Sequence, residues 1–152
     1  MYVKEAEFHE LDTIYAIGFD SWNNGLSDEK YLDECRGSEK YQAGTWYVLM
    51  ENDDILSSLI VYHGRFNLKE GYFGIGSVAT PYKLRGKGYA SHLINLVKAE
   101  LFLNHNAKAI FLHSDIGHQF YNRLGFVSVG GSDCMYISHD SSKFDGVLPT
   151  YF

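Results

Sequence analysis

The sequence predicts a single mixed α/β domain over residues 1–152, and three observations lead to that prediction. The chain has 152 residues, a length that suits one domain of about 100–200 residues. Hydrophobic residues make up 45 % of the chain, which is enough for a packed core, and their spacing changes between strand-like and helix-like along it. No repeat or Pro- or Ser-rich linker divides the sequence. The predicted element order is βααβββαβαββ, with a strand–helix–strand crossover late in the chain.

The first part of the chain predicts one strand and two helices. Residues 2–6 are expected to form a short strand. Apolar residues then recur at helical spacing from Leu11, through Ile14 and Tyr15 to Phe19. A second helix is expected over Ser27–Cys35, because a serine cap followed by acidic residues stabilises the start of a helix.

The middle of the chain predicts three strands. Apolar runs over 45–50 and 55–62 flank Asn52-Asp53-Asp54, a composition typical of turns, so they are expected to form a hairpin. A further strand is expected over 72–79, although it contains Gly74 and Gly76. Glycine inside a strand often marks a bulge or the close approach of another backbone or ligand.

The last part of the chain predicts two helices and three strands. One buried helix face is expected from the residues Ala90, Leu93, Ile94, Val97 and Leu101. A buried strand over 109–113 and a short helix over 119–124, stopped by Gly125, are expected to follow. Runs at 126–129 and 134–137 predict a closing hairpin.

Composition limits the partners that the chain is expected to bind. The net charge is −6, so a nucleic-acid partner would need a concentrated basic patch, and cationic small substrates are modestly favoured. No apolar run reaches the roughly 18 residues of a membrane span. Cys35 and Cys134 match no disulfide or metal-site spacing and are expected to be buried thiols. The N-terminus lacks the features of a signal peptide, so we expect a cytoplasmic protein that binds no nucleic acid and no membrane, with a homodimer possible.

A basic glycine loop at 83–91 is the most informative segment. It joins the glycine-containing strand to the best-defined helix, and it adds Lys83, Arg85 and Lys87 to an otherwise acidic chain. Glycines let several backbone N–H groups converge, and a helix N-terminus contributes positive partial charge. These features suit a pyrophosphate, whereas the alternative is a solvated basic turn before an ordinary helix.

Two familiar phosphate-binding motifs do not fit this loop. A Walker-A loop needs Ser or Thr after its Gly-Lys pair, but Gly88 follows Lys87. A dinucleotide fingerprint needs a third glycine where Ser91 stands, and an acidic residue about 20 positions further on, where 104–109 has none.

The loop resembles the acetyl-CoA signature of the GNAT-type N-acetyltransferases, Gln/Arg-x-x-Gly-x-Gly/Ala, through Arg85, Gly88 and Ala90. The segment Tyr121-x-x-x-Gly125-Phe126 resembles the second motif of this family, and the predicted element order is the order of the family. The resemblance in element order covers essentially the whole chain, and the residues that match the motifs of the family lie between about 76 and 126. It implies a splayed mixed β-sheet flanked by helices, with acetyl-CoA as co-substrate.

The resemblance also implies a set of cofactor contacts. Backbone N–H groups would hold the pyrophosphate, the strand end would pair with the pantetheine arm, and an N–H near Val78 would polarise the thioester carbonyl. The loop contacts are Arg85, Gly86, Lys87, Gly88, Tyr89, Ala90 and Ser91, and the strand-end contacts are Val78, Ala79 and Thr80. Ser114 takes the place of a frequent Asn that contacts the cofactor, so this contact is expected to be weaker or absent. Gly74 and Gly76 would leave room for the thioester where the strand bulges away from its neighbour.

Tyr121 matches the family tyrosine that protonates the departing thiolate, although a role in core packing is the alternative. Many members carry a catalytic Glu where this chain has Tyr72. Glu70 is expected to share a strand face with Tyr72 and to act through a water molecule, unless it is a solvated strand-end charge. Three rival proton acceptors are His63, His113 and Asp115. His113 and His118 lack a third ligand at useful spacing, so no metal is expected.

The acceptor pocket of the family comes from the first two helices. Here that segment includes Trp22, followed by the acidic residues Asp28, Glu29, Asp33 and Glu34; a core aromatic beside a solvated helix face is the alternative. The prediction is an acetyl-CoA-dependent N-acetyltransferase that moves acetyl directly to a primary amine of a small molecule or peptide. The alternative is a non-catalytic acyl-CoA-sensing module, and a nucleotide-binding protein is disfavoured by the failed fingerprints.

Overall fold

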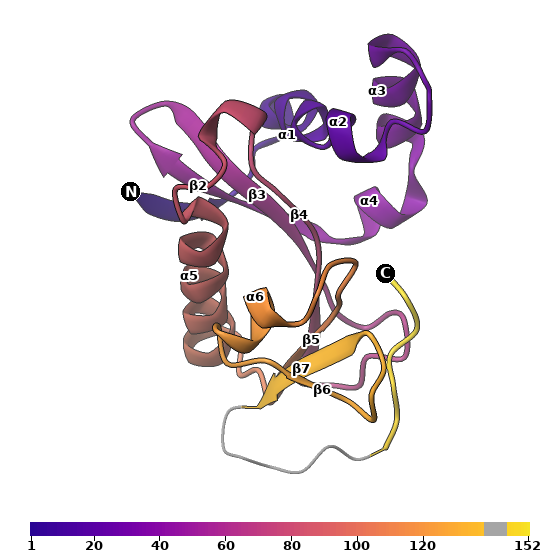
Figure 1. The fold of residues 1–152 in the computed structure, drawn as a ribbon, viewed down its shortest axis with the longest axis vertical. Coiled ribbons are helices and arrows are strands. Elements are labelled where there is room, and N and C mark those ends of the chain that lie inside the picture. The colour runs from indigo at the N-terminus through magenta and orange to yellow at the C-terminus, as the bar shows by residue number, and fades with distance from the viewer. Residues whose placement is uncertain (139–145) are drawn as a thin grey trace. The chain divides into compact units, whose positions relative to one another are not determined.

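The computed structural model describes residues 1–138 and 146–152, and its elements are labelled in Figure 1. Its seven strands form a sheet in the order β1-β2-β3-β4-β5-β7-β6. The strands are β1 (Tyr2–Glu5), β2 (Thr45–Glu51), β3 (Asp54–Tyr62), β4 (Tyr72–Ala79), β5 (Ala109–His113), β6 (Val127–Ser128) and β7 (Cys134–Ser138). The predicted mixed α/β fold class with this splayed sheet is confirmed.

Helices precede β2 and connect the later strands. They are η1 (Phe8–Glu10), α1 (Leu11–Ile17), α2 (Phe19–Trp22), α3 (Asp28–Gly37), α4 (Glu39–Ala43), η2 (Tyr82–Leu84), α5 (Tyr89–Asn104) and α6 (Gln119–Asn122). The chain divides into two compact units, one of residues 1–60 with 77–93 and one of residues 61–76 with 94–152. A single domain over 1–152 stays a prediction.

In the first unit, the predicted helix from Leu11 is interrupted. It ends at Ile17, and Phe19 begins the separate helix α2. Gly18 lies between them against the Trp22 ring, since a Cβ at Gly18 would come within 2.3 Å of that ring. The short helix α4 was not predicted, although Ser38 caps it by accepting a hydrogen bond from the Tyr41 N–H at 3.2 Å.

The core of the first unit is aromatic and aliphatic. The rings of Tyr15, Tyr41 and Trp46 pack together, with centroid distances between 5.2 and 6.0 Å. Ser27 caps α3 as predicted, accepting a hydrogen bond from the Lys30 N–H at 3.3 Å. Cys35 is buried on the same helix as a free thiol, and Cys134 is also free and buried, as expected.

In the second unit, β4 and β5 are parallel neighbours, which confirms the predicted crossover through α5. Antiparallel β7 pairs with the other edge of β5 along its whole length, from Ala109 opposite Ser138 to His113 opposite Cys134. The buried face of α5 in this unit includes Ile94, Val97 and Leu101, as its periodicity predicts.

The backbone irregularity in β4 occurs at a residue other than its glycines. Ser77 has φ +48°, a left-handed conformation inside a strand. Such a conformation is uncommon for a residue with a side chain and is often found at functional sites. The side chain of Ser77 is hydrogen-bonded to the phenol of Tyr41 within the first unit.

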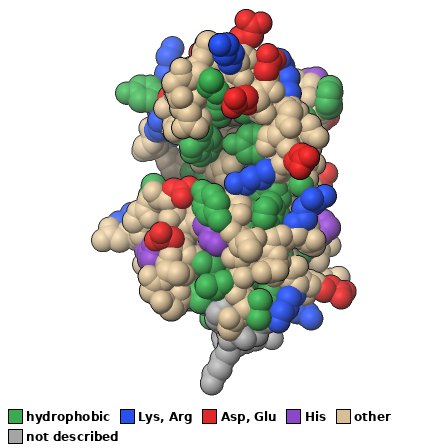
Figure 2. Space-filling model, turned by 90° about the vertical axis from the view of Figure 1, so that its right-hand side faces the viewer, with side chains coloured by type: hydrophobic (Ala, Val, Ile, Leu, Met, Phe, Trp, Pro, Cys, Tyr) green, Lys and Arg blue, Asp and Glu red, His purple; other side chains and the backbone are tan. Residues whose placement is uncertain are grey.

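Charged side chains of both signs are spread over the surface. On the face in Figure 2, acidic and basic groups are interspersed, and neither sign gathers into a continuous area. In the described ranges, no helix is long and apolar enough to cross a bilayer. Residues 1–138 and 146–152 also contain no group of three His, Cys, Asp or Glu side chains arranged to hold a metal ion.

Candidate active site

The loop before α5 has a conformation that requires its glycines. Gly86 has φ +79° and Gly88 has φ +83°, and no atom lies within 4 Å of a Cβ built on either residue. The space around these glycines is therefore open, and their backbone conformation is what excludes other residues. The loop is exposed, so its amide groups are accessible.

The backbone N–H groups at the start of α5 lack partners within the described ranges. The first N–H that bonds into the helix is that of His92, which donates to the carbonyl of Gly88 at 3.0 Å. Gly86 through Ser91 donate no backbone hydrogen bond to any described residue. Unpaired N–H groups at the start of a 16-residue helix form an anion site, because they carry partial positive charge and point away from the helix.

The side chain of Arg85 does not supply a free charge to this loop. Its guanidinium pairs with Asp20, with Nη1–Oδ2 at 2.8 Å and Nη2–Oδ1 at 3.0 Å, and its Nε donates to the carbonyl of Thr80 at 3.0 Å. The positive charge that Arg85 adds to this loop is therefore paired with Asp20, and the role of Arg85 in holding the pyrophosphate stays a prediction. The same pair lowers the pKa of Asp20, through the hydrogen bonds from Arg85.

The end of β4 is fixed by a buried hydroxyl. Ser57 is fully buried on β3 and donates to the carbonyl of Ala79 at 2.9 Å, with its oxygen 3.0 Å from the Thr80 hydroxyl. Together with the contact from Arg85, these bonds hold the residues between strand and loop in one conformation. These are the residues expected to pair with the pantetheine arm.

The β4–β5 pairing stops after three residue pairs. The register runs from Tyr72 opposite Ala109 to Gly74 opposite Phe111, and Ile75 and Gly76 have no partner on β5. The two strands therefore separate beyond Gly74, within the second unit. This separation is the splay that the resemblance implies.

Tyr121 lies on α6 with its ring against Phe120 and Phe126, at centroid distances of 5.0 and 6.1 Å. Burial, with a smaller contribution from the negative charge of Asp115, raises the pKa of Tyr121 to about 12. The described residues offer its hydroxyl no hydrogen-bond partner. Tyr121 therefore keeps its proton at neutral pH, as a proton donor must.

The turn that carries Tyr121 is held from α5. The Lys98 ammonium donates to the carbonyl of Leu124 and lies 5.8 Å from the ring centroid of Phe126. Burial lowers the pKa of Lys98. Gly125 has φ +94°, and the Phe126 N–H closes the turn on the Tyr121 carbonyl at 3.1 Å. The glycine of this motif is therefore needed for its backbone conformation.

Two predicted site residues have a different setting from the one expected. Glu70 lies in an exposed turn before β4, and Gly71, with φ +83°, separates it from Tyr72. The expected shared strand face is therefore wrong, because the extended alternation does not continue through Gly71. Ser114 is buried, and its hydroxyl donates to the carbonyl of Ile116 at 2.7 Å. That hydroxyl is occupied within its own loop, so we no longer expect it to contact the cofactor.

The rival acid–base groups are distributed over the second unit. The ring of His63 contacts Phe73 at the start of β4, with a centroid distance of 5.7 Å. His113 is half-buried at the end of β5, and its Nε2 lies 3.1 Å from the Thr150 carbonyl. Asp115 is exposed and accepts a hydrogen bond from the Tyr151 hydroxyl at 3.1 Å.

The expected acceptor segment includes the half-buried Trp22, whose ring packs on Gly18. The acidic residues that follow on α3, namely Asp28, Glu29, Asp33 and Glu34, are exposed. Asp33 is already paired with Arg36 at 2.9 Å. The structure therefore favours a packed aromatic beside a solvated helix face.

The arm of residues 146–152 was not recognised in the sequence. It returns to the second unit, where the Thr150 N–H donates to the Phe66 carbonyl at 2.8 Å and Phe152 is buried. No periodicity or motif in Gly146–Phe152 indicates this docking. Its apolar residues indicate that the segment could be buried, but they do not indicate which part of the chain it packs against.

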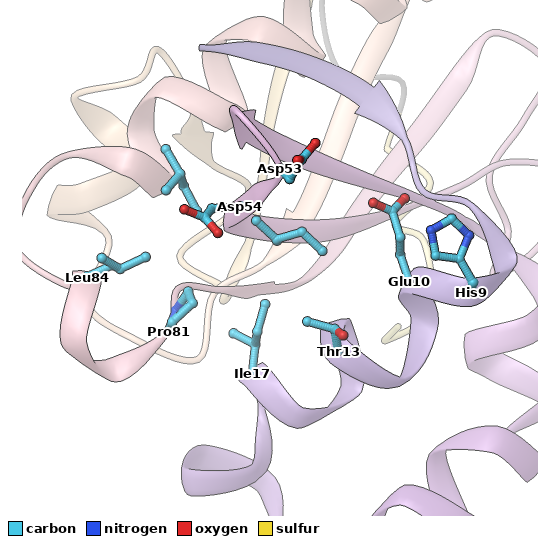
Figure 3. A pocket seen from close by; sticks show the side chains of 10 residues that line it. His9, Glu10, Thr13, Ile17, Asp53, Asp54, Pro81 and Leu84 are labelled. Carbon is cyan, nitrogen blue, oxygen red and sulfur yellow. The ribbon is translucent and has the colours of Figure 1, made fainter.

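An acidic cavity of about 520 Å³ lies in the first unit between α1, the β2–β3 turn and η2 (Figure 3). Its lining includes the acidic residues Glu10, Asp53 and Asp54 and the apolar residues Ile17 and Leu84. Glu10 is already paired with Lys4 at 2.9 Å. We assign this cavity no role in the reaction.

Comparison with models of protein families matches residues 8–126 to the acetyltransferase (GNAT) family. Among solved structures, the chain is similar to a GNAT family acetyltransferase from Brucella melitensis in complex with acetyl-CoA, with a TM-score of 0.71 and 17 % identity over 99 % of this chain and 95 % of that one. It is also similar to a chimera of the spermidine N-acetyltransferase SpeG from Vibrio cholerae and hSSAT, with a TM-score of 0.69 and 17 % identity over 91 % and 96 % of the two chains. A search of curated proteins found no match.

Proposed function

The chain belongs to the acetyltransferase (GNAT) family and is an N-acetyltransferase; from this premise we propose that it moves the acetyl group of acetyl-CoA directly to a primary amine of a small molecule or peptide. The observation that carries the proposal is the row of N–H groups without described partners from Gly86 to Ser91. Six consecutive amide donors, three in the exposed loop and three in the first turn of α5, match the several oxygens of a pyrophosphate.

Residues at the end of β4 position the rest of the co-substrate in this proposal. Val78, Ala79 and Thr80 pair with the pantetheine arm through their backbone, as an added strand would. The N–H near Val78 polarises the thioester carbonyl and stabilises the negative charge that develops there when the amine attacks. The fixed strand end supports this role, since Ser57 and Arg85 already hold it in place.

Tyr121 supplies a proton to the departing thiolate in the proposal. Its raised pKa keeps it protonated, and its hydroxyl has no described partner that would compete for the proton. The demand is modest, because a thiol with a pKa near 8.5 is already a fair leaving group. We therefore expect proton donation by Tyr121 to raise the rate by a factor at the low end of the range for general acid catalysis.

Direct transfer is favoured over an acetyl-enzyme intermediate by the state of the thiols. Both cysteines are buried, and burial is the main reason that the pKa of each is raised, for Cys134 to about 11. A thiol with a raised pKa is a poor nucleophile at neutral pH, because the thiolate is the reactive form.

One observation favours a second candidate, a non-catalytic acyl-CoA-binding module. The strand β4 contains no carboxylate, and Glu70 lies outside it in a turn. An enzyme without a general base on this strand requires its amine to arrive uncharged or to lose its proton elsewhere. Turnover with an amine separates the two candidates.

Thermal unfolding in the presence of acetyl-CoA, CoA, ATP and NAD tests the cofactor. A ligand at 100 times its dissociation constant stabilises the folded protein by about 2.7 kcal/mol. We expect acetyl-CoA and CoA to raise the melting temperature, and ATP and NAD to have little effect. Stabilisation by ATP or NAD without stabilisation by acetyl-CoA would refute the proposal. A cytoplasmic location and a homodimer stay predictions.

A further inference from the structure

The ring of Phe152 lies directly on Gly74. A Cβ built on Gly74 would come within 2.5 Å of the ring, and the nearest atoms are all ring carbons of Phe152. Gly74 does not have a positive φ, so the close approach of the ring explains this glycine. The room that the resemblance assigns to a thioester at Gly74 is therefore occupied by a side chain of the same protein.

Phe152 belongs to a closed aromatic cluster in the second unit. Its ring contacts those of Tyr62, Phe66 and His113, with centroid distances of 5.6, 5.6 and 4.7 Å. Phe152 is only 5 % exposed, and Tyr62 is fully buried. The ring of Phe152 is therefore packed among other aromatic rings and is shielded from solvent.

Polar contacts on the preceding residues fix the position of the ring. The Thr150 N–H donates to the Phe66 carbonyl at 2.8 Å, and the Thr150 carbonyl lies 3.1 Å from His113 Nε2. The Tyr151 hydroxyl donates to Asp115 at 3.1 Å. These contacts on the two preceding residues hold the arm in place and so fix the position of the Phe152 ring.

The Phe152 ring lies at the point where β4 and β5 separate. Gly74 is the last residue of β4 that pairs with β5, and His113 belongs to the part of β5 beyond that pairing. Phe152 contacts both residues. Under the proposed function the acyl group lies against β4, and an acyl group long enough to reach Gly74 would meet the ring of Phe152.

We propose that Phe152, docked on Gly74 by the 146–152 arm, limits the length of the acyl group, so that acetyl is accepted and medium-length acyl chains are rejected. This inference rests on the proposed function, because it assumes that acyl-CoA binds along β4. Removal of the ring would leave a space beside Gly74 that is bounded by the rings of Tyr62, Phe66 and His113. A space lined mainly by ring carbons can take up a hydrocarbon group.

The test measures the dissociation constants of acetyl-CoA and hexanoyl-CoA by calorimetry, which needs no acceptor amine. The variants are Phe152→Ala and, as a milder change that is easier to fold, Phe152→Leu. Leu148→Ala is the matched control, since Leu148 is 42 % exposed on the same arm. The readout is the ratio of the two affinities, which a general loss of stability leaves unchanged.

We expect the wild-type protein to bind hexanoyl-CoA no more tightly than acetyl-CoA. In Phe152→Ala the relative affinity for hexanoyl-CoA should rise by at least about tenfold, since each buried methylene is worth about fourfold in affinity. Phe152→Leu should change the ratio in the same direction by less, and Leu148→Ala should leave it unchanged. The same ratio in wild type and in every folded Phe152 variant would overturn the inference and leave the proposed function standing. No binding of either thioester to the wild-type protein would overturn both.

Discussion

Asp20 and Arg85 form a two-point ion pair, with nitrogen–oxygen distances of 2.8 and 3.0 Å, although 64 residues separate them in the sequence. The pair leaves the Arg85 Nε free to donate to the Thr80 carbonyl. The arginine of the acetyl-CoA signature therefore binds the backbone at Thr80 and a carboxylate on α2.

Replacement of Arg85 should separate its two contacts. Arg85→Gln can retain a hydrogen bond to the Thr80 carbonyl and should bind acetyl-CoA within about threefold of wild type, because an exposed ion pair contributes little. Asp20→Asn should behave in the same way. Arg85→Ala loses both contacts and should weaken binding about fivefold, as expected for about 1 kcal/mol. Calorimetric dissociation constants measure this, and an equal loss in Arg85→Gln and Arg85→Ala would show that the charge matters.

Gly88→Val should weaken acetyl-CoA binding by at least about tenfold. Valine is strained by about 1–3 kcal/mol at the positive φ of this position, so the loop would change conformation and its N–H groups would no longer converge. Gly131→Val is the matched control, since Gly131 also has a positive φ (+75°) and open surroundings. Both variants should lose similar stability, and only Gly88→Val should lose affinity. Unchanged affinity in Gly88→Val contradicts the pyrophosphate assignment.

Tyr121→Phe should lower kcat by about 10²-fold, the low end for general acid–base catalysis, and leave the dissociation constant of acetyl-CoA nearly unchanged. The ring keeps its packing against Phe120 and Phe126, and only the phenolic proton is lost. Tyr136→Phe is the control, because Tyr136 packs against Phe111 in the same unit and has no proposed role. Steady-state thiol release measures kcat, and full activity in Tyr121→Phe would remove Tyr121 from the mechanism.

The raised pKa of Tyr121 predicts the direction of its pH dependence. A general acid is active when protonated, so a pKa raised from 10.0 to about 12 moves the loss of activity to higher pH. At pH about 10, where an ordinary tyrosine is half ionised, Tyr121 should still be protonated. The difference in tyrosinate absorbance between wild type and Tyr121→Phe measures this. A full tyrosinate difference at that pH would contradict the buried setting of Tyr121.

Local features of the sequence, namely residue composition, periodicity and turn residues, predicted most of the fold. Residues 72–79 and 109–113 form strands with the predicted bounds, because strand composition, turn residues and burial favour the same structure in these segments. Helix α4 was missed because five residues are too few to show a period. The break at Gly18 was missed because the Trp22 ring, and not a helix-stop signal, requires that glycine.

The candidate site was predictable where backbone conformation determines the residue. Gly86, Gly88 and Gly125 all have positive φ, so the motifs record conformations that other residues rarely adopt. Contacts between distant segments gave no signal. Neither the pairing of Asp20 with Arg85 nor the docking of Phe152 on Gly74 follows from local periodicity, because both depend on the tertiary fold. The expected position of Glu70 was wrong for a related reason, since one glycine ended the strand alternation.

Detection of acetylated product tests the central claim most directly. Amino acids, polyamines and aminoglycosides are each incubated with acetyl-CoA and the protein, and mass spectrometry measures the acetylated amine while a thiol reagent measures released CoA. The account predicts that at least one class of amine gains an acetyl group in equal amount to the CoA released, at a rate that falls in Tyr121→Phe. Tight binding of acetyl-CoA without acetylation of any amine would contradict it and favour the acyl-CoA-binding module.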